Sequence, residues 1–446
     1  MSPSDRERPL ESELGVMTVP INRAVSKGMK NTEHLWSQQM VTIIETGCIE
    51  NTDRTAWQTL NTLLHREGSD QTLKLRTITD LCDRHGKDIE EYQEAHTEEV
   101  LKANGFEPET GLPQKGADLP EGILPPVDRC ADTSDERIQG LINGINEKRE
   151  GRERIPDDSR KPYDVEAPDD AVVEVSLDEV LSKRQKEHRR KGVESQETQE
   201  QQKTQTKKRP SVGTSVAHIR VNGKRYILTA HDMRSLCIKA LAFLLNAELL
   251  SNRQLIIFSD GAAEIKTCVD EIFGFCCHYV ILDWFHLKKH CYELLSMILI
   301  SGKSNRDMRH NVMTALMRIL WVGNVTGAID YLKELPANCI KSEEKRQDLI
   351  SYLHRKEPVI ACYAIRRKLG LRISSNPVEK ANDLTVASRQ KHRGMSWSYH
   401  GSWHFAALTA LYLNHEEDTW HNTGSLSFKM VPISTSKSIA TTPVAA

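Results

Sequence analysis

Residues 254–260 read QLIIFSD, an apolar run that stops on an aspartate, and residues 277–283 repeat the pattern as CHYVILD. Each run is typical of a buried strand with a carboxylate at its C-terminal edge. Open α/β sheets bind their ligands at that edge. Acids gathered there add nothing to stability. We therefore expect them to bind a divalent cation, which prefers carboxylate oxygens as ligands.

The segments before these runs extend the sheet. AVVEVSLDEV (171–180) has strand composition and ends near Asp178, and SVAHIRVNGKRYILTAH (215–231) predicts two strands joined by a tight turn at Asn222-Gly223. An apolar helix precedes each of the two later strands. The order strand, strand, strand, helix, strand, helix, strand predicts an α/β fold with a mixed sheet, in the ribonuclease H-like order.

Composition shifts divide the 446 residues into segments. We expect Gly86 and Gly105 to end helices in the first of them. The predicted segments are a mostly helical N-terminal region (1–110), an irregular linker (111–170), the first part of the core (171–285), a helical insertion (286–370), the second part of the core with two helices (371–420) and a flexible tail (421–446).

Three acids are candidates for one metal site: Asp178, Asp260 and Glu379. In the predicted order the strands that carry the two aspartates are neighbours, and Glu379 lies on the first turn of a late helix that must pack over the same edge. Three carboxylates suit two divalent ions, which can activate an attacking oxygen and stabilise the leaving one.

Each acid also has a structural interpretation. Asp178 fits an ordinary strand end, and Asp260 with the glycine after it fits a plain turn. Asn376-Pro377-Val378-Glu379 fits a helix start with a capping box, in which Glu379 would cap the helix.

A further acid follows the strand at 277–283. Asp283 and His286 are three apart at a predicted helix start and would share a face. We expect them to be an accessory pair: they would form a buried hydrogen bond, hold a metal or contact DNA. The alternative is a purely structural pair.

Basic residues follow the acids along the chain, although 60 Lys and Arg against 62 Asp and Glu leave a net charge of −2. Cations beside metal-binding acids suggest neutralisation of a nucleic-acid backbone. The alternative is a solvated charged face. The candidate DNA-binding residues are Lys183, Arg184, Lys186, Arg189, Arg190, Arg389, Lys391 and Arg393.

Five strings in this order resemble a known family. They are VSLDEVLSKRQKEHR, HIRVNGKRYIL, FSDGAAEIK, YVILDWFHLKKH and NPVEKANDLTVASRQKHRGMSWS. Together they are similar to bacterial insertion-sequence DDE transposases related to the Mutator-like group, over about residues 171 to 414. The late string is the most specific. Two departures stand out: a polar tract follows Asp178, and the N-terminal region has no Cys-paired zinc module.

The resemblance implies a ribonuclease H-like catalytic core with a helical insertion before the Glu379 helix. It implies a DNA transposase that uses two Mg²⁺ or Mn²⁺ ions on Asp178, Asp260 and Glu379. Such an enzyme cleaves the ends of its mobile element and transfers the freed strand into target DNA. The implied partners are element-end DNA, target DNA and further copies of the chain. Two alternatives remain: a ribonuclease H-like nuclease without strand transfer, and a catalytically inactive DNA-binding derivative.

The bulk sequence also predicts the surroundings of the chain. No apolar run approaches the roughly 18 residues that a transmembrane helix needs, and the N-terminus lacks the apolar stretch of a secretory signal. None of the ten cysteines forms a C-x-x-C pair, so we expect free buried thiols rather than zinc ligands. We therefore expect a cytoplasmic, nucleoid-associated bacterial protein with no membrane partner.

Overall fold

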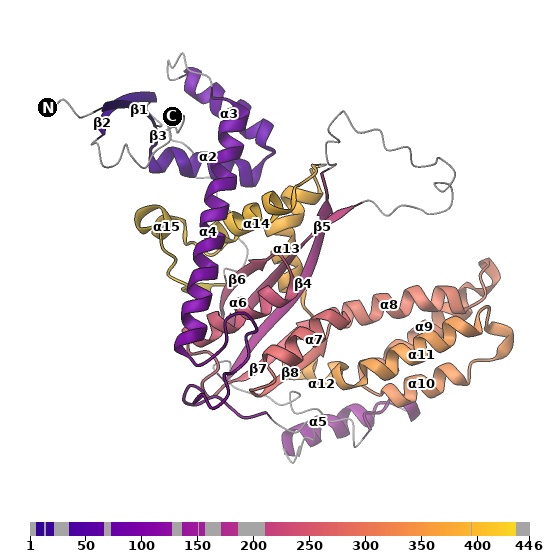
Figure 1. Ribbon diagram of the computed structural model, residues 1–446. Coiled ribbons are helices and arrows are strands. Elements are labelled where there is room, and N and C mark those ends of the chain that lie inside the picture. The colour runs from indigo at the N-terminus through magenta and orange to yellow at the C-terminus, as the bar shows by residue number, and fades with distance from the viewer. Residues whose placement is uncertain are drawn as a thin grey trace, which may run out of the picture.

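The structure is a computed structural model built around one mixed α/β sheet (Figure 1). It describes residues 6–12, 15–21, 35–66, 73–126, 136–149, 151–156, 171–185, 210–393 and 395–433. The central sheet has the strand order β8-β7-β4-β5-β6-β9. Its strands are β4 (Val172–Lys183), β5 (Ser211–Val221), β6 (Lys224–Ala230), β7 (Gln254–Ser259), β8 (His278–Leu282) and β9 (Val431–Pro432).

The directions of the strands match the predicted order. β4, β5 and β6 are joined antiparallel, and β7 and β8 then extend the sheet parallel to β4. The predicted hairpin is confirmed, because Val221 pairs with Lys224 across two residues of positive φ, Asn222 at 50° and Gly223 at 68°. Two such residues in a two-residue loop match the right-handed twist of the strands.

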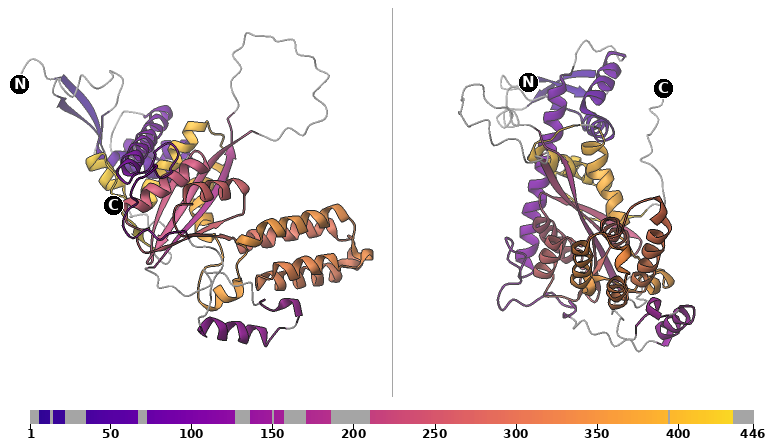
Figure 2. Two further views of the ribbon diagram at one scale, coloured as in Figure 1. Left: turned by 60° about the horizontal axis from the view of Figure 1, so that its bottom comes forward. Right: turned by 90° about the vertical axis from the view of Figure 1, so that its right-hand side faces the viewer.

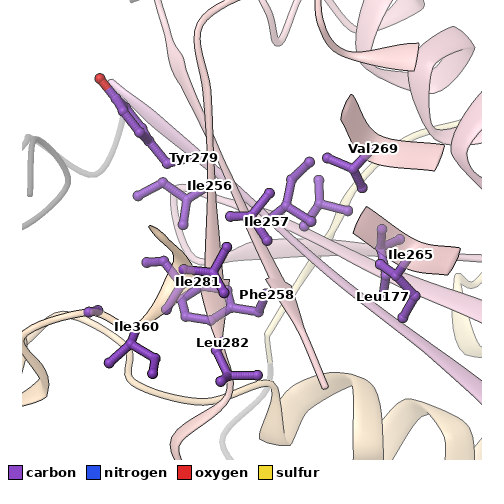
Figure 3. Close-up of a cluster of buried hydrophobic side chains, with 14 of the residues drawn as sticks. Leu177, Ile256, Ile257, Phe258, Ile265, Val269, Tyr279, Ile281, Leu282 and Ile360 are labelled. Atoms are coloured by element: carbon purple, nitrogen blue, oxygen red, sulfur yellow. The ribbon is translucent and has the colours of Figure 1, made fainter. Parts of the chain in front are cut away.

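Helices cover both faces of the sheet, which is why its strands are buried on both sides. On β6, Leu228 packs with helix α6 (Met233–Asn246), whereas Ile227 packs with helix α14 (Tyr399–Leu413). Side chains alternate across a strand, so neighbouring residues reach opposite layers. Helix α7 (Ala263–Ile272) joins the α6 layer, and Figure 3 shows its Ile265 and Val269 beside apolar strand residues.

A group of helices leaves the sheet after β8 and projects to one side of it (Figure 2, left). This group corresponds to the segment predicted as a helical insertion (286–370), but it starts two residues earlier, at Trp284. Its helices are α8 (Trp284–Ile298), α9 (Arg306–Trp321), α10 (Val325–Lys333), α11 (Glu343–Lys356) and α12 (Tyr363–Lys368). The chain then returns to the sheet through α13 (Asn376–Asn382), a π-helix (Asp383–Lys391) and α14.

The N-terminal region contains more strand than the sequence predicts. Besides α2 (Gln38–Glu50), α3 (Asp53–Arg66) and α4 (Leu75–Ala103), it holds a small sheet of order β2-β1-β3. The strands of this sheet are β1 (Arg6–Ser12), β2 (Gly15–Ile21) and β3 (Leu35–Trp36). Proline and charged residues in β1 hid its strand character from the sequence pattern.

The two glycines predicted to end helices behave differently. Gly105 lies just after the end of α4 with φ of 78°, as predicted. Gly86 does not end a helix, because it lies in the middle of α4 at the crossing with α14. A Cβ atom on Gly86 would lie 2.1 Å from the backbone oxygen of His404, so only glycine lets the two helices approach this closely.

The predicted linker and tail are partly structured. Helix α5 (Glu136–Asn146) and a short 3-10 turn, η1 (Gly151–Glu153), lie within the segment predicted as irregular. Ile138 and Ile142 of α5 are buried in one cluster with Val322 and Ile365 of the helical insertion. Helical spacing of these isoleucines explains the helix, and the prolines and glycines around it concealed the pattern.

The tail predicted as flexible from residue 421 also contains structure. Helix α15 (Glu417–Thr423) continues beyond residue 421, where the predicted tail begins. Leu426 is buried, and β9 pairs with β6. Burial of Leu426 and pairing with an edge strand hold this segment in place. Residues 434–446 lie outside the described residues.

The cysteines are free thiols, as predicted, where the structure describes them. Nine cysteines are described, all are free thiols, and all except Cys339 are buried. In the described ranges, no helix combines the length and the apolar character that crossing a membrane requires.

Candidate metal site at the sheet edge

Asp178 and Asp260 occupy equivalent positions on neighbouring parallel strands. The last paired residues of β4 and β7 are Ser176 and Phe258, and each aspartate comes two residues later. The prediction that Asp178 ends its strand is wrong, because β4 runs on to Lys183 as the partner of β5. What ends near Asp178 is the pairing with β7, and this opens the edge of the sheet beside its carboxylate.

The late helix brings Glu379 to the same edge. Asn382, three residues after Glu379 on α13, donates a hydrogen bond from Nδ2 to Oδ2 of Asp178 at 2.6 Å. The pKa of Asp178 is raised to about 6, chiefly by burial and also by the negative charges of Asp260 and Glu379. The backbone N–H of Glu179 and the charge of His286 act in the opposite direction. Asp178 therefore lies close enough to Asp260 and to Glu379 to be affected by the negative charge of each.

Glu379 does not cap its helix. Asn376 is the first residue of α13 rather than its cap, Ser375 precedes the helix, and no side chain caps it. The side chain of Glu379 is 47% exposed. The capping-box interpretation is therefore wrong, and the carboxylate points to the solvent-accessible side of the edge.

The buried side chain of Asp283 links the start of α8 to the start of α13. It is fully buried, and its Oδ1 accepts a hydrogen bond from the backbone N–H of His286 at 2.8 Å, which caps α8. Its Oδ2 accepts hydrogen bonds from the backbone N–H and the hydroxyl of Ser375, at 2.5 and 3.0 Å. Burial alone would raise the pKa of Asp283, but these hydrogen bonds outweigh it and lower the pKa. Asp283 thus fixes the start of α13, the helix that carries Glu379.

His286 lies between Asp283 and the acids at the edge of the sheet. Its Nδ1 is 3.3 Å from Oδ1 of Asp283 and 3.9 Å from Oε1 of Glu379. The interaction with Asp283 raises the pKa of His286, and the charges of Asp260 and Asp178 raise it further, against the opposing effect of burial. Protonated His286 therefore offsets part of the negative charge at the edge.

The turn after β7 is held by a lysine of the helical insertion. Lys356 of α11 donates a hydrogen bond from Nζ to the backbone oxygen of Gly261 at 2.5 Å. Gly261 has φ of 88°, and the backbone N–H of Ala262 donates to Oδ1 of Asp260 at 2.7 Å. Sequence reasoning missed Lys356, which no motif marks. It also missed Asn382, which three-residue spacing from Glu379 would have revealed.

The predicted DNA-binding residues divide into groups. Lys183, Lys391 and Arg393 are exposed, and the guanidinium of Arg184 lies 4.7 Å from the ring centre of Tyr399. Lys183 and Arg184 lie at the end of β4, five and six residues beyond Asp178. Lys186, Arg189 and Arg190 lie outside the described residues.

Arg389 is not a surface residue, so its predicted contact with DNA is wrong. It is 1% exposed, it forms an ion pair with Asp53 of α3, and it donates from Nε to the backbone oxygen of Cys48 at 2.9 Å. Its guanidinium lies 5.3 Å from the ring centre of Trp397 and 5.2 Å from that of Phe405. A buried arginine needs such partners, and here they join the π-helix to the N-terminal region.

The acid set fits a pair of divalent cations by its charge. Among the ion pairs of the described residues, none joins a Lys or Arg to Asp178, Asp260 or Glu379. The ligand atoms of the three acids do not form one of the groups lying within 4.8 Å of one another in the described ranges, as the atoms of Glu45, His85 and His421 do. They are thus spaced more widely than a cage for a single ion. Carboxylates from three separate elements, without a Lys or Arg partner among these ion pairs, suit hard cations.

Comparison with known proteins gives no further assignment. No family model matches the chain. No curated protein and no solved structure is similar enough to match it.

Proposed function

We propose that the chain is a DDE transposase with a ribonuclease H-like core. The strand order β6-β5-β4-β7-β8, with the first three antiparallel and the last two parallel to β4, supports the core assignment. The observation that carries the proposal is the convergence of Asp178, Asp260 and Glu379 at one edge of the sheet. Each aspartate follows the last β4–β7 pair by two residues, and Asn382 of the Glu379 helix bonds to Asp178 at 2.6 Å. These acids come from β4, the end of β7 and α13, and a helical insertion separates the last from the other two.

In this proposal the three acids hold two Mg²⁺ or Mn²⁺ ions. Bound ions of this kind activate an oxygen nucleophile and stabilise the leaving oxygen of a phosphodiester. The side chains of the protein supply the positioning. Asn382 orients the carboxylate of Asp178, Lys356 holds the turn that carries Asp260, and Asp283 fixes the start of the Glu379 helix.

His286 tunes the charge of the proposed site. Its pKa is raised, chiefly by the interaction with Asp283, and its Nδ1 lies 3.9 Å from Oε1 of Glu379. A positive charge there limits repulsion among the acids before cations bind. Its side chain is half-buried, with 29% of its surface accessible.

DNA is the proposed partner, both as element ends and as target. Exposed Lys183 lies at the end of β4 beyond Asp178, and exposed Lys391 and Arg393 lie shortly before Trp397, whose backbone N–H donates to the backbone oxygen of Lys183. Such cations neutralise a phosphate backbone. We also propose that the protein assembles as a homo-oligomer, because both ends of an element must be cut and joined together.

The test is cleavage and strand transfer on a mini-element that carries the DNA flanking the reading frame on each side. With Mg²⁺ or Mn²⁺, the wild-type protein should release the mini-element and join its 3′ ends to a target plasmid. Asp260→Asn should lower both rates by several orders of magnitude, because it removes a cation ligand. Asp330→Asn, at a half-exposed acid of α10, is the matched control and should keep full activity.

The products separate the proposal from its rivals. Nicked or linear products without joined ends would favour a nuclease that lacks strand transfer. Salt-sensitive binding without any cleavage would favour an inactive DNA-binding derivative. Unchanged rates in Asp260→Asn would overturn the proposed acid set.

A further inference from the structure

A basic groove lies between α5 and the helical insertion, where Figure 1 shows α5 below α12. It has a volume of about 650 Å³, and a second hollow of about 270 Å³ adjoins it along α8. The two share Arg149, Arg318 and Trp321. Neither hollow includes any of the three acids, so the groove is a separate feature of the fold.

Cations dominate the charged residues that line this groove. The one acid among the lining residues is Glu153, whose oxygens lie 3.5 Å from Arg149 and 3.7 Å from Arg318. A cleft lined by charges of one sign attracts ligands of the opposite charge, so this groove favours an anionic ligand. The lining cations are Lys148, Arg149, Lys288, Arg318, Arg367 and Lys368.

Aromatic rings from α8 and α9 accompany the cations. Tyr292 is 46% exposed, and Nζ of Lys288 lies 5.7 Å from its ring centre. Trp321 is half-buried and meets Trp284 edge to face, with ring centres 4.9 Å apart at 70°. Exposed rings beside cations form platforms on which nucleic-acid bases stack.

The walls of the groove are held by packing, so the groove is preformed. The apolar side of α5 buries Ile138 and Ile142 in one cluster with Ile365 of α12. Gly140 and Gly144 of α5 line the groove, and a Cβ atom on either would meet no atom within 4 Å. The glycines therefore leave open space where larger side chains would reach toward a ligand.

We propose that this groove binds a single-stranded segment of nucleic acid, with its phosphates on the cations and its bases against Tyr292 and Trp321. A duplex fits the lining less well, because its bases are stacked inside the helix and cannot reach the rings. Trp284, Lys288 and Tyr292 are spaced by four residues and share one face of α8, whereas His286 turns toward the acids. The groove is therefore a second nucleic-acid site on the far side of α8, and it needs neither metal nor catalysis.

The test measures binding by the full-length Asp260→Asn protein in EDTA, so that cleavage plays no part. Fluorescence anisotropy would follow a labelled twelve-nucleotide oligo(dT) and a labelled duplex of equal length. The groove variant is Arg367→Glu/Lys368→Glu, at two exposed positions. Lys87→Glu/Lys102→Glu reverses two charges on α4, where the side chains are 56% and 61% exposed, and is the matched control.

The groove variant should bind oligo(dT) at least roughly tenfold more weakly at about 100 mM salt, with a shallower dependence on salt. The control should bind as the parent does. Tyr292→Ala should weaken oligo(dT) roughly fivefold and leave duplex binding unchanged, because only unpaired bases stack on the ring. Photocrosslinking of bromouracil-containing single strands to the parent should label Tyr292 or the adjoining wall of α5.

Three results would overturn the proposal. The first is equal affinity of the groove and control variants for oligo(dT). The second is an equal loss of duplex binding in the groove variant, which would indicate a duplex surface. The third is crosslinking confined to residues outside the groove. Because the parent carries Asp260→Asn, none of these results bears on the acid chemistry.

Discussion

Asn382 and Asp178 are 204 residues apart in the chain, yet Nδ2 of Asn382 donates to Oδ2 of Asp178 at 2.6 Å. This hydrogen bond ties α13 to the central strand β4, and it stabilises the ionised form of a carboxylate that burial disfavours. Asn382 is therefore a positioning residue rather than a cation ligand.

Asn382→Ala should shift the pH–rate profile of DNA cleavage to higher pH and lower the rate near neutral pH by about tenfold. The reason is that the pKa of Asp178 rises when its carboxylate loses a donor. The measurement is cleavage of element-end DNA from pH 5 to 9. Asn422→Ala on α15 is the control, and a profile that coincides with that of the wild type would contradict the assigned role.

Asp178→Asn should stabilise the protein above neutral pH. The folded-state pKa of about 6 lies above the usual value of 3.8. The fold therefore loses stability as pH rises from about 4 through 6, on the order of 2 kcal/mol. Urea unfolding at pH 8 should show the variant to be more stable, and unfolding at pH 4 should show little difference.

Divalent cations provide an independent check on Asp178. Mg²⁺ or Mn²⁺ should raise the unfolding temperature of the wild type at pH 8, because a cation relieves repulsion among the acids. The same ions should leave Asp178→Asn nearly unchanged. Equal shifts in both proteins would mean that the ions bind elsewhere.

Asp283→Ala should be among the most destabilising substitutions of a single acid. It leaves the backbone N–H of His286 and both donors of Ser375 without their buried acceptor, at a cost of about 3 kcal/mol. Ser342→Ala, which removes the cap of α11, should cost about 1 kcal/mol. Urea denaturation measures both, and equal losses would show that Asp283 acts only as a cap.

Gly261→Ala should disturb the turn that carries Asp260. A Cβ there would lie 2.6 Å from Cδ1 of Leu282, and φ is 88°, so the substitution adds a clash to backbone strain. Gly370→Ala meets no atom within 4 Å at φ of 75° and isolates the strain, about 1 kcal/mol. Chemical denaturation and cation affinity should both suffer more in Gly261→Ala, and equal effects on both would contradict this account.

Arg389→Ala and Arg393→Ala should separate structure from DNA binding. The first leaves Asp53 unpaired beside buried rings and should cost about 3–5 kcal/mol. The second removes an exposed cation and should stay within about 0.5 kcal/mol of the wild type while weakening DNA binding. A stable Arg389→Ala protein with reduced DNA affinity would restore the surface interpretation.

Local patterns predicted the elements whose residues act locally. The run at 254–260 and the Asn222-Gly223 turn each fix their own backbone, and the structure has the strand and the hairpin there. The closeness of Asp178, Asp260 and Glu379 also agrees with the predicted order, because strand order determines which C-terminal edges meet.

The missed features depend on partners distant in sequence. Gly86 looks like a helix stop until α14 packs against it, and Arg389 looks like a surface cation until Asp53 and Trp397 enclose it. The buried contact predicted for Asp283 and His286 is present, but the hydrogen bonds from Ser375 to Asp283 join residues 92 apart and were not predicted. A single sequence shows the residue types and not the environments that set their roles.

The separation of Asp178 from Asn382 also sets the order in which the site assembles during synthesis. At about 5–20 residues per second, a ribosome needs roughly 10–40 s to make the 204 residues between them. A nascent chain that already holds both aspartates still lacks α13 and therefore lacks Glu379. The edge of the sheet is completed only when the last part of the core leaves the ribosome, so unfinished chains carry an incomplete acid set.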